Sequence, residues 1–173
     1  MIKQDISENQ AKIAYLAIGS NLGNKNLNVE IAKSKLINYE IQILKSSSKY
    51  ETLSWPDPKK PKFINLVLKI KTFFSAKDLM NKCHKIENEL GKKKSKKNEP
   101  RIIDIDIIDY DQKIINHKKN NLTIPHPEMH KRNFVLIPFF EITKSWIHPI
   151  KKKEIKNLIK LLDIQDLRAI KLI

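Results

Sequence analysis

Two aspartates separated by one residue are the clearest chemical feature of the sequence. Asp104 and Asp106 lie within an apolar stretch that predicts a β-strand over residues 102–110. Side chains alternate across a strand, so both carboxylates point to the same face, where like charges repel unless a cation is bound. Mg²⁺ takes one or two carboxylates and completes its octahedron with water and phosphate oxygens. The pattern therefore favours a nucleotide-bound magnesium site over a strand with a solvated outer face.

Cationic residues precede this pair. Arg101 stands three residues before Asp104 and can offer a bidentate fork to phosphoryl oxygens, the alternative being a surface arginine at the start of a strand. The lysines of residues 92–97 favour a polyphosphate partner, although a charge run is usually a solvated loop. Because residues 92–101 are polar and poor in apolar anchors, we expect them to form a lid that orders on nucleotide binding.

A second group of functional candidates lies between Thr123 and Phe134. Prolines on both sides of His126 restrict its backbone, which suits a contact to phosphate or to a transition state, whereas a lone loop histidine is more often structural. Arg132 can supply another phosphate fork, and Phe134 can supply an aromatic face for a planar ring.

Hydrophobic periodicity predicts the elements that position these residues. Strands at 13–18, 41–51, 63–71 and 102–110 and helices at 25–39 and 75–90 follow in the order β-α-β-β-α-β. This order is the ferredoxin-like double split βαβ unit, an antiparallel four-stranded sheet with two helices on one face. Ser75 and Asp78 form a capping box at the start of the second helix. Cys83 lies on the apolar stripe of that helix and is interpreted as a small core residue rather than a nucleophile.

The fold class is therefore α+β, in a single domain over residues 1–173. Its core spans about 12–142, and a C-terminal helical extension spans about 143–173. Residues 134–140 are apolar. Apolar residues recur after position 153 and predict one helix packed against the body; they are Ile155, Leu158, Ile159, Leu162 and Ile164.

Composition excludes other classes of protein. Hydrophobic residues make up 40% and charged residues 31%, which is typical of a globular chain, and no apolar run is long enough for a membrane span. The single cysteine and the absence of a signal-peptide pattern in residues 1–12 lead us to expect a cytoplasmic protein with no membrane partner. The net charge of +15 suits a polyanionic partner, but abundant lysine, isoleucine and asparagine also match an A/T-rich genome. Only local clusters of charge therefore carry an argument.

Taken together, these motifs resemble those of the hydroxymethyldihydropterin pyrophosphokinase family. The resemblance rests on Arg101-x-x-Asp104-Ile-Asp106-Ile-Ile, on Ile-Pro125-His126, and on Arg132-x-Phe134. The opening Ala17-Ile-Gly-Ser-Asn-Leu-Gly23, Phe63-Ile-Asn65 and Ile86-Glu87 also fall where family motifs would place them. The similarity covers about residues 13–142, and the ordered set is far more specific than any one motif.

The resemblance implies transfer of pyrophosphate from ATP to 6-hydroxymethyl-7,8-dihydropterin in folate biosynthesis, by a monomer with two Mg²⁺ ions. Asp104 and Asp106 would ligate both ions, and Asp104 would also contact the substrate. The ATP contacts that it implies are Lys92, Lys94, Arg101, Ile107, Thr123, His126 and Arg132, with Thr123 near the adenosine. The pterin would lie between aromatic faces at Phe134 and around Phe63, with its polar edge read by Thr52 and Asn65.

The sequence departs from the family pattern in the lid. Lysines stand at 92 and 94 where arginines are usual, Asn98 replaces a tryptophan that closes over the pterin, and Glu99 replaces a glycine. His84 replaces a glutamine that can contact phosphate. These departures weaken the lid contacts and leave the metal-binding pair intact.

Two other functions are compatible with parts of the sequence. The same βαββαβ order underlies an RNA-recognition module, but its aromatic signature is missing and the two aspartates would repel RNA, so we expect no nucleic-acid partner. A scaffold that keeps the fold without activity is the third alternative, and only the lid departures suggest it.

Overall fold

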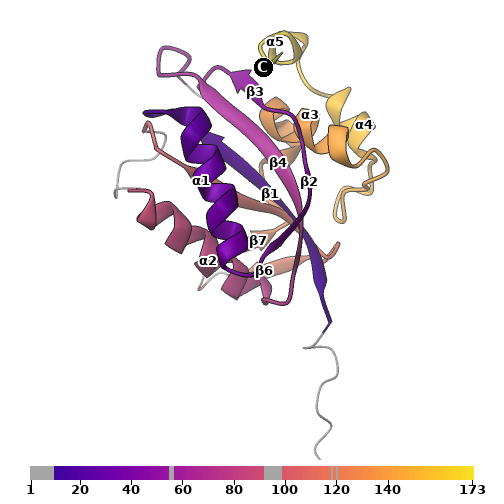
Figure 1. Ribbon diagram of the computed structural model, residues 1–173. Helices are drawn as coiled ribbons and strands as arrows, with labels where there is room; N and C mark the ends of the chain where they lie inside the picture. The colour runs from indigo at the N-terminus through magenta and orange to yellow at the C-terminus, as the bar shows by residue number, and fades with distance from the viewer. Residues whose placement is uncertain (1–9, 55–56, 92–98, 118, 120) are drawn as a thin grey trace, which may run out of the picture.

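A six-stranded antiparallel sheet forms the centre of the molecule (Figure 1). The computed structural model describes residues 10–54, 57–91, 99–117, 119 and 121–173. Strand order is β5-β1-β4-β3-β8, and β2 also pairs with β4. The strands are β1 Lys12–Ser20, β2 Gln42–Ser46, β3 Tyr50–Thr52, β4 Phe63–Thr72, β5 Asp104–Tyr110 and β8 Lys171–Leu172. The sheet therefore has the predicted antiparallel α+β character, with six strands instead of four.

The first of the two extra strands arises because the predicted strand 41–51 is interrupted. Both polar groups of Ser47 bond to Val67 of β4: its N–H donates to the carbonyl at 2.9 Å, and its Oγ accepts from the N–H at 2.9 Å. A side-chain hydroxyl here takes the place of a strand bond, so β2 ends at Ser46 and β3 begins only at Tyr50. The prediction of one continuous strand was wrong at this point.

Two helices cover the first face of the sheet, as the sequence predicted. Helix α1 spans Lys25–Asn38 and helix α2 spans Ala76–Glu89. Ser75 caps α2, since its Oγ accepts from the N–H of Asp78 at 3.1 Å. Cys83 is buried in the apolar cluster beneath these helices, so its predicted place in the core is confirmed, and burial raises the pKa of its thiol.

The second face is covered by two helices, and periodicity predicted only the second of them. Helix α3 spans Asn133–Ile142 and packs with α4, Ile155–Ile159, over a separate apolar cluster. The ring of Phe139 lies 4.6 Å from that of Tyr15 and 4.8 Å from that of Trp146, measured between centroids. Helix α3 is apolar almost all round because it lies between the sheet and α4, and such a segment shows no stripe. The sheet is thus a middle layer with helices on both faces (Figure 1).

The C-terminal region corrects the prediction of a single helix. Helix α4 ends at Ile159, and a second short helix, α5, spans Ile164–Arg168. Asp163 separates them, because its extended backbone begins α5 and its Oδ1 accepts from the N–H of Gln165 at 2.8 Å. The chain then adds β8 to the sheet edge beside β3. Ile155 and Leu158 are buried in the second cluster, together with residues of the sheet and of α3.

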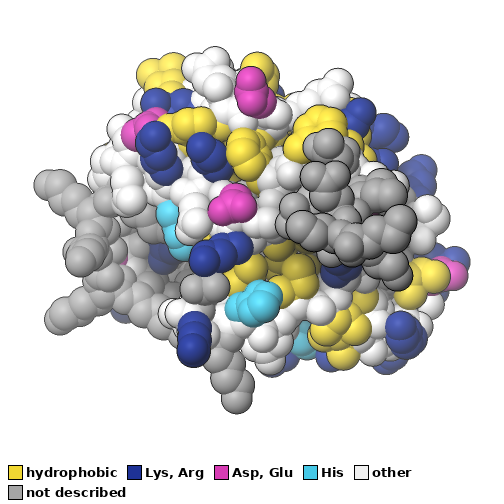
Figure 2. All heavy atoms as spheres, turned by 90° about the horizontal axis from the view of Figure 1, so that it is seen from below, with side chains coloured by type: hydrophobic (Ala, Val, Ile, Leu, Met, Phe, Trp, Pro, Cys, Tyr) yellow, Lys and Arg dark blue, Asp and Glu magenta, His cyan; other side chains and the backbone are white. Residues whose placement is uncertain are grey.

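Positive charge is spread over the surface. On the end of the molecule seen from below in Figure 2, Lys and Arg side chains are scattered among hydrophobic and uncharged ones and form no single patch. None of the described helices combines the length and the apolar character needed to cross a membrane.

A buried carboxylate on the second face makes stability depend on pH. Asp109 is 1% exposed, its Oδ1 has no hydrogen-bond partner among the described residues, and burial raises its pKa to about 6. In the unfolded chain this group titrates near the ordinary value of 3.8. Between these two values the folded state holds more protons, so stability falls as pH rises from about 4 to about 6.

We therefore expect Asp109→Asn to raise stability above pH 6 and to remove this part of the pH dependence. The largest gain at pH 7.5 is about 3 kcal/mol, because burying the charge no longer costs free energy. Thermal unfolding of parent and variant at pH 4.5 and pH 7.5 measures the difference, with Asp111→Asn as the control for loss of one negative charge. A variant that is destabilised equally at both pH values would contradict the prediction.

Candidate active site

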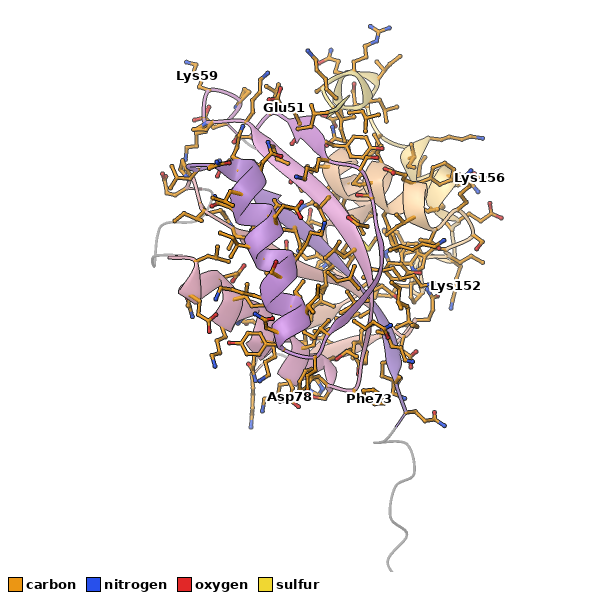
Figure 3. All side chains as sticks on the ribbon, in the orientation of Figure 1. Glu51, Lys59, Phe73, Asp78, Lys152 and Lys156 are labelled. Carbon is orange, nitrogen blue, oxygen red and sulfur yellow. The ribbon has the colours of Figure 1, made fainter. Side chains whose placement is uncertain are left out.

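A pocket of about 270 Å³ opens on the second face, where β1, β3, β4 and β5 meet the start of α3. It lies at the end of the sheet where the chain leaves β1 and enters β5, the end that carries Glu51 and Lys59 in Figure 3, opposite Phe73 and Asp78. Nine residues named from the sequence line it: Thr52, Phe63, Asn65, Arg101, Asp104, Asp106, His126, Arg132 and Phe134. Residues more than eighty positions apart in the chain therefore share one cavity.

The two aspartates enter the pocket from β5. Asp104 pairs in register with Gly19 and Asp106 with Ala17, so strand alternation places both carboxylates on the pocket side as predicted. Ile107 points the other way into the first apolar cluster and is absent from the pocket lining. The ATP contact expected at Ile107 therefore lies outside this lining and stays a prediction.

Each carboxylate faces an arginine. Arg101 Nη1 lies 3.0 Å from Asp104 Oδ1, and Arg132 Nη1 lies 3.7 Å from Asp106 Oδ2. All four side chains are between 25% and 41% exposed, so the ion pairs are reachable by solvent and by a charged ligand. This wall of the pocket alternates cationic and anionic groups, as a site for a metal-bound polyphosphate requires.

His126 is held by backbone contacts with its ring turned to this wall. Its N–H donates to the carbonyl of Ile108 at 3.0 Å, and its Nδ1 accepts from the N–H of Glu128 at 3.2 Å. Nε2 lies 3.8 Å from Asp106 Oδ2. Burial lowers the pKa of His126 and outweighs the opposing effect of Asp106, which favours the neutral ring. Nδ1 makes the shorter contact with a donor, at 3.2 Å from Glu128 N against 3.5 Å between Nε2 and Arg132 Nη1, so we assign the proton of the neutral ring to Nε2.

The opposite wall is built for a flat polar ligand. Asn65 Nδ2 donates to Thr52 Oγ1 at 2.8 Å, and both residues are buried. This bond leaves Asn65 Oδ1 directed at the space beside Gly19, where an added Cβ would come within 2.9 Å of it. The rings of Phe63 and Phe134 also line the cavity, and the guanidinium of Arg132 lies 5.6 Å from the centroid of Phe134. Sequence reasoning missed the role of Gly19, although a glycine at the end of the predicted strand 13–18 was a signal of close approach by another group.

Thr123, His84 and Glu99 were also named from the sequence, and none of them is part of the pocket lining. Thr123 is exposed on β7, Leu122–Ile124, outside the pocket lining, and His84 is exposed on α2. Lys92 and Lys94, like Asn98 and most of the expected lid, lie outside the described residues. Glu99 at the end of that segment forms an ion pair with Lys60 at 3.0 Å.

A polar wall that can hold polyphosphate, facing an aromatic wall that can hold a ring, is the arrangement that a phosphoryl-group transferase needs. The fold and the site therefore define an enzyme of that class. A family model described as 7,8-dihydro-6-hydroxymethylpterin-pyrophosphokinase (HPPK) matches residues 15–144. The chain belongs to this family, and it is a diphosphokinase of folate biosynthesis.

Individual relatives agree. A 2-amino-4-hydroxy-6-hydroxymethyldihydropteridine pyrophosphokinase of Aquifex aeolicus is 39% identical over 143 residues, which cover 83% of this chain and 88% of the relative. The folic acid synthesis protein fol1 of Schizosaccharomyces pombe is 36% identical over 158 residues, 91% of this chain but 21% of that longer protein. A crystal structure of Plasmodium falciparum HPPK-DHPS with pterin and p-hydroxybenzoate superposes with a TM-score of 0.71 at 16% identity. That match covers 94% of this chain and 47% of the other, and it supports the fold.

Proposed function

We propose that this pocket transfers the pyrophosphoryl group of MgATP to the hydroxymethyl group of 6-hydroxymethyl-7,8-dihydropterin. The observation that carries the proposal is the meeting of the Asp104 and Asp106 carboxylates, two arginines and a histidine with the Asn65–Thr52 pair inside one cavity. The strand order with two helices on the first face supports the assignment of the core to the ferredoxin-like double split βαβ unit.

Asp104 and Asp106 suit magnesium that arrives with a nucleotide. Among the described residues no group of three or more His, Cys, Asp or Glu side chains could form a complete metal site. Two carboxylates on one strand face instead leave several coordination positions for phosphate oxygens and water, which is how Mg²⁺ binds on nucleotides. We propose two ions there, which when bound would neutralise phosphate charge and orient the β-phosphate.

The remaining polar residues would bind and orient ATP. The guanidinium groups of Arg101 and Arg132 would leave the carboxylates and donate to phosphate oxygens of ATP. The Nε2–H of His126 would donate to a further phosphate oxygen. We also keep Lys92, Lys94 and Thr123 as proposed ATP contacts, with Thr123 near the adenosine. Pre-organised donors of this kind stabilise charge that spreads over the phosphate oxygens in the transition state.

The pterin would lie between Phe63 and Phe134. Its hydroxyl oxygen attacks the β-phosphorus in line, the bond from that phosphorus to the oxygen bridging to the α-phosphate breaks, and AMP leaves. The hydroxyl proton is released, and we assign no residue as its general base. Positioning and charge neutralisation supply the rate enhancement, since this chemistry needs little covalent catalysis.

A coupled assay of AMP release with and without the pterin tests the proposal. We expect pterin-dependent AMP formation that requires Mg²⁺ and yields pterin diphosphate. ATP consumption at the same rate with and without the pterin would contradict the proposal. Binding of both substrates without turnover would also contradict it, and this is the result expected of a scaffold. The RNA-binding alternative finds no support, because α3 and α4 cover the sheet face that such a module would present. A cytoplasmic location and a monomeric state stay predictions from the sequence.

Asn65→Ala is expected to weaken pterin binding more than it slows chemistry. The amide of Asn65 is the buried polar group that faces the proposed pterin site. Its loss would leave polar atoms of the bound pterin without a hydrogen-bond partner, which lowers pterin affinity. We expect KM for the pterin to rise roughly 10- to 100-fold with kcat changed far less. Steady-state kinetics at saturating MgATP gives both values, with the exposed Asn116→Ala as the matched control. A loss confined to kcat would place Asn65 in the phosphate half of the site.

A further inference from the structure

Asn21, the residue directly after β1, forms hydrogen bonds to both the N–H and the carbonyl of Arg101. Its Oδ1 accepts from the N–H of Arg101 at 2.8 Å, and its own N–H donates to the carbonyl of Arg101 at 3.2 Å. Asn21 is 3% exposed, so these bonds are screened from water. A buried amide must satisfy both its oxygen and its nitrogen, and here the oxygen is committed to Arg101.

The nitrogen of the same amide is bonded to a different loop. Asn21 Nδ2 donates to Ser54 Oγ at 3.3 Å and to the carbonyl of Pro61 at 3.1 Å. Both acceptors belong to the loop between β3 and β4, which begins beside Thr52 and ends at Phe63 in the pocket wall. These two bonds fix which way the amide points, so its oxygen is presented to Arg101.

Arg101 needs such support because it precedes the sheet. Strand β5 begins at Asp104, so the ladder between β1 and β5 does not include Arg101. The next residue is held from helix α1, since Asn28 Nδ2 donates to the carbonyl of Ile102 at 3.2 Å. The guanidinium of Arg101 reaches Asp104 Oδ1 at 3.0 Å from a backbone that these asparagines hold in place.

We infer that Asn21 is a positioning residue for pyrophosphoryl transfer, which acts by fixing the backbone of Arg101 so that its guanidinium meets the ATP phosphates. The inference rests on the proposed role of Arg101. A displacement of about 1 Å in a phosphate-binding group can cost roughly 100-fold in rate, so a residue that touches no substrate can control turnover. Neither the family motif nor the pocket lining assigns this role to Asn21.

A double-mutant cycle tests the inference. Asn21→Ala should lower kcat by about 10- to 100-fold with KM for the pterin within about threefold of the parent. In the Arg101→Ala background, Asn21→Ala should lower kcat by less than about threefold, because the guanidinium that Asn21 positions is already absent. Asn24→Ala in the same turn is the control: Asn24 caps α1 by accepting from Leu27 N–H at 3.1 Å, so this variant should lose thermal stability with kcat unchanged.

The outcomes separate this inference from the proposed function. Losses of kcat that multiply in the double variant, or a change in pterin KM alone, would overturn the role of Asn21 and leave that of Arg101 standing. Normal turnover of Arg101→Ala by itself would refute the role of Arg101 and, with it, this inference. If Asn21→Ala does not fold, Asn21→Ser completes the same cycle, since serine is too short to span from Arg101 to the β3–β4 loop.

Discussion

Asp106→Asn is expected to abolish turnover while the protein stays folded. The exchange keeps the size of the side chain and removes one of the two charges proposed to hold Mg²⁺, so kcat should fall by about 100-fold or more. Asp106 is 41% exposed and its contacts to Arg132 and His126 are 3.7 and 3.8 Å long, so their loss should change stability by less than about 1 kcal/mol. Asp106→Asn also removes the repulsion from Asp104 on the same strand face, which acts to raise stability.

Three measurements on Asp106→Asn and Asp104→Asn check this expectation. AMP release reports turnover, thermal unfolding without Mg²⁺ reports the fold, and calorimetric titration of MgATP reports the metal-dependent contact. Asp111→Asn, one residue beyond β5 and outside the pocket, is the matched control and should behave like the parent in turnover and MgATP binding. Near-normal turnover in both site variants would refute the metal assignment and, with it, the proposed mechanism.

Arg101→Ala should produce the second large effect. Its guanidinium is assigned to charge that develops on the phosphates, so kcat should fall by roughly 10² to 10³, while pterin affinity changes by less than about threefold. Arg101→Lys should recover only part of the rate, because an ammonium group restores the charge but not the planar fork. The exposed Arg168→Ala on α5 controls for the loss of one positive charge.

Steady-state kinetics of these arginine variants gives kcat. Direct binding of the pterin in the presence of a non-hydrolysable ATP analogue gives the pterin affinity separately. Full recovery by lysine would show that only the net charge matters. A loss of pterin affinity as large as the loss of kcat would show that Arg101 belongs to the ring half of the site, contrary to the division proposed above.

The sequence by itself determined the features that depend on local periodicity. Alternation on a strand is enough to place Asp104 and Asp106 on one face, and spacings of three and four residues with a capping serine are enough to define α2 and bury Cys83. The ordered motifs also identified the family. None of these inferences needed contacts between distant parts of the chain.

The tertiary structure decided the second face and the pocket built on it. Helix α3 is apolar almost all round, so periodicity could not define it, yet its position brings Arg132 and Phe134 opposite β5. Long-range hydrogen bonds likewise decided that Ser47 interrupts a strand and that Asn21 supports Arg101. Such bonds join residues dozens of positions apart, where local sequence patterns carry no information, and only packing of the whole chain brings them together.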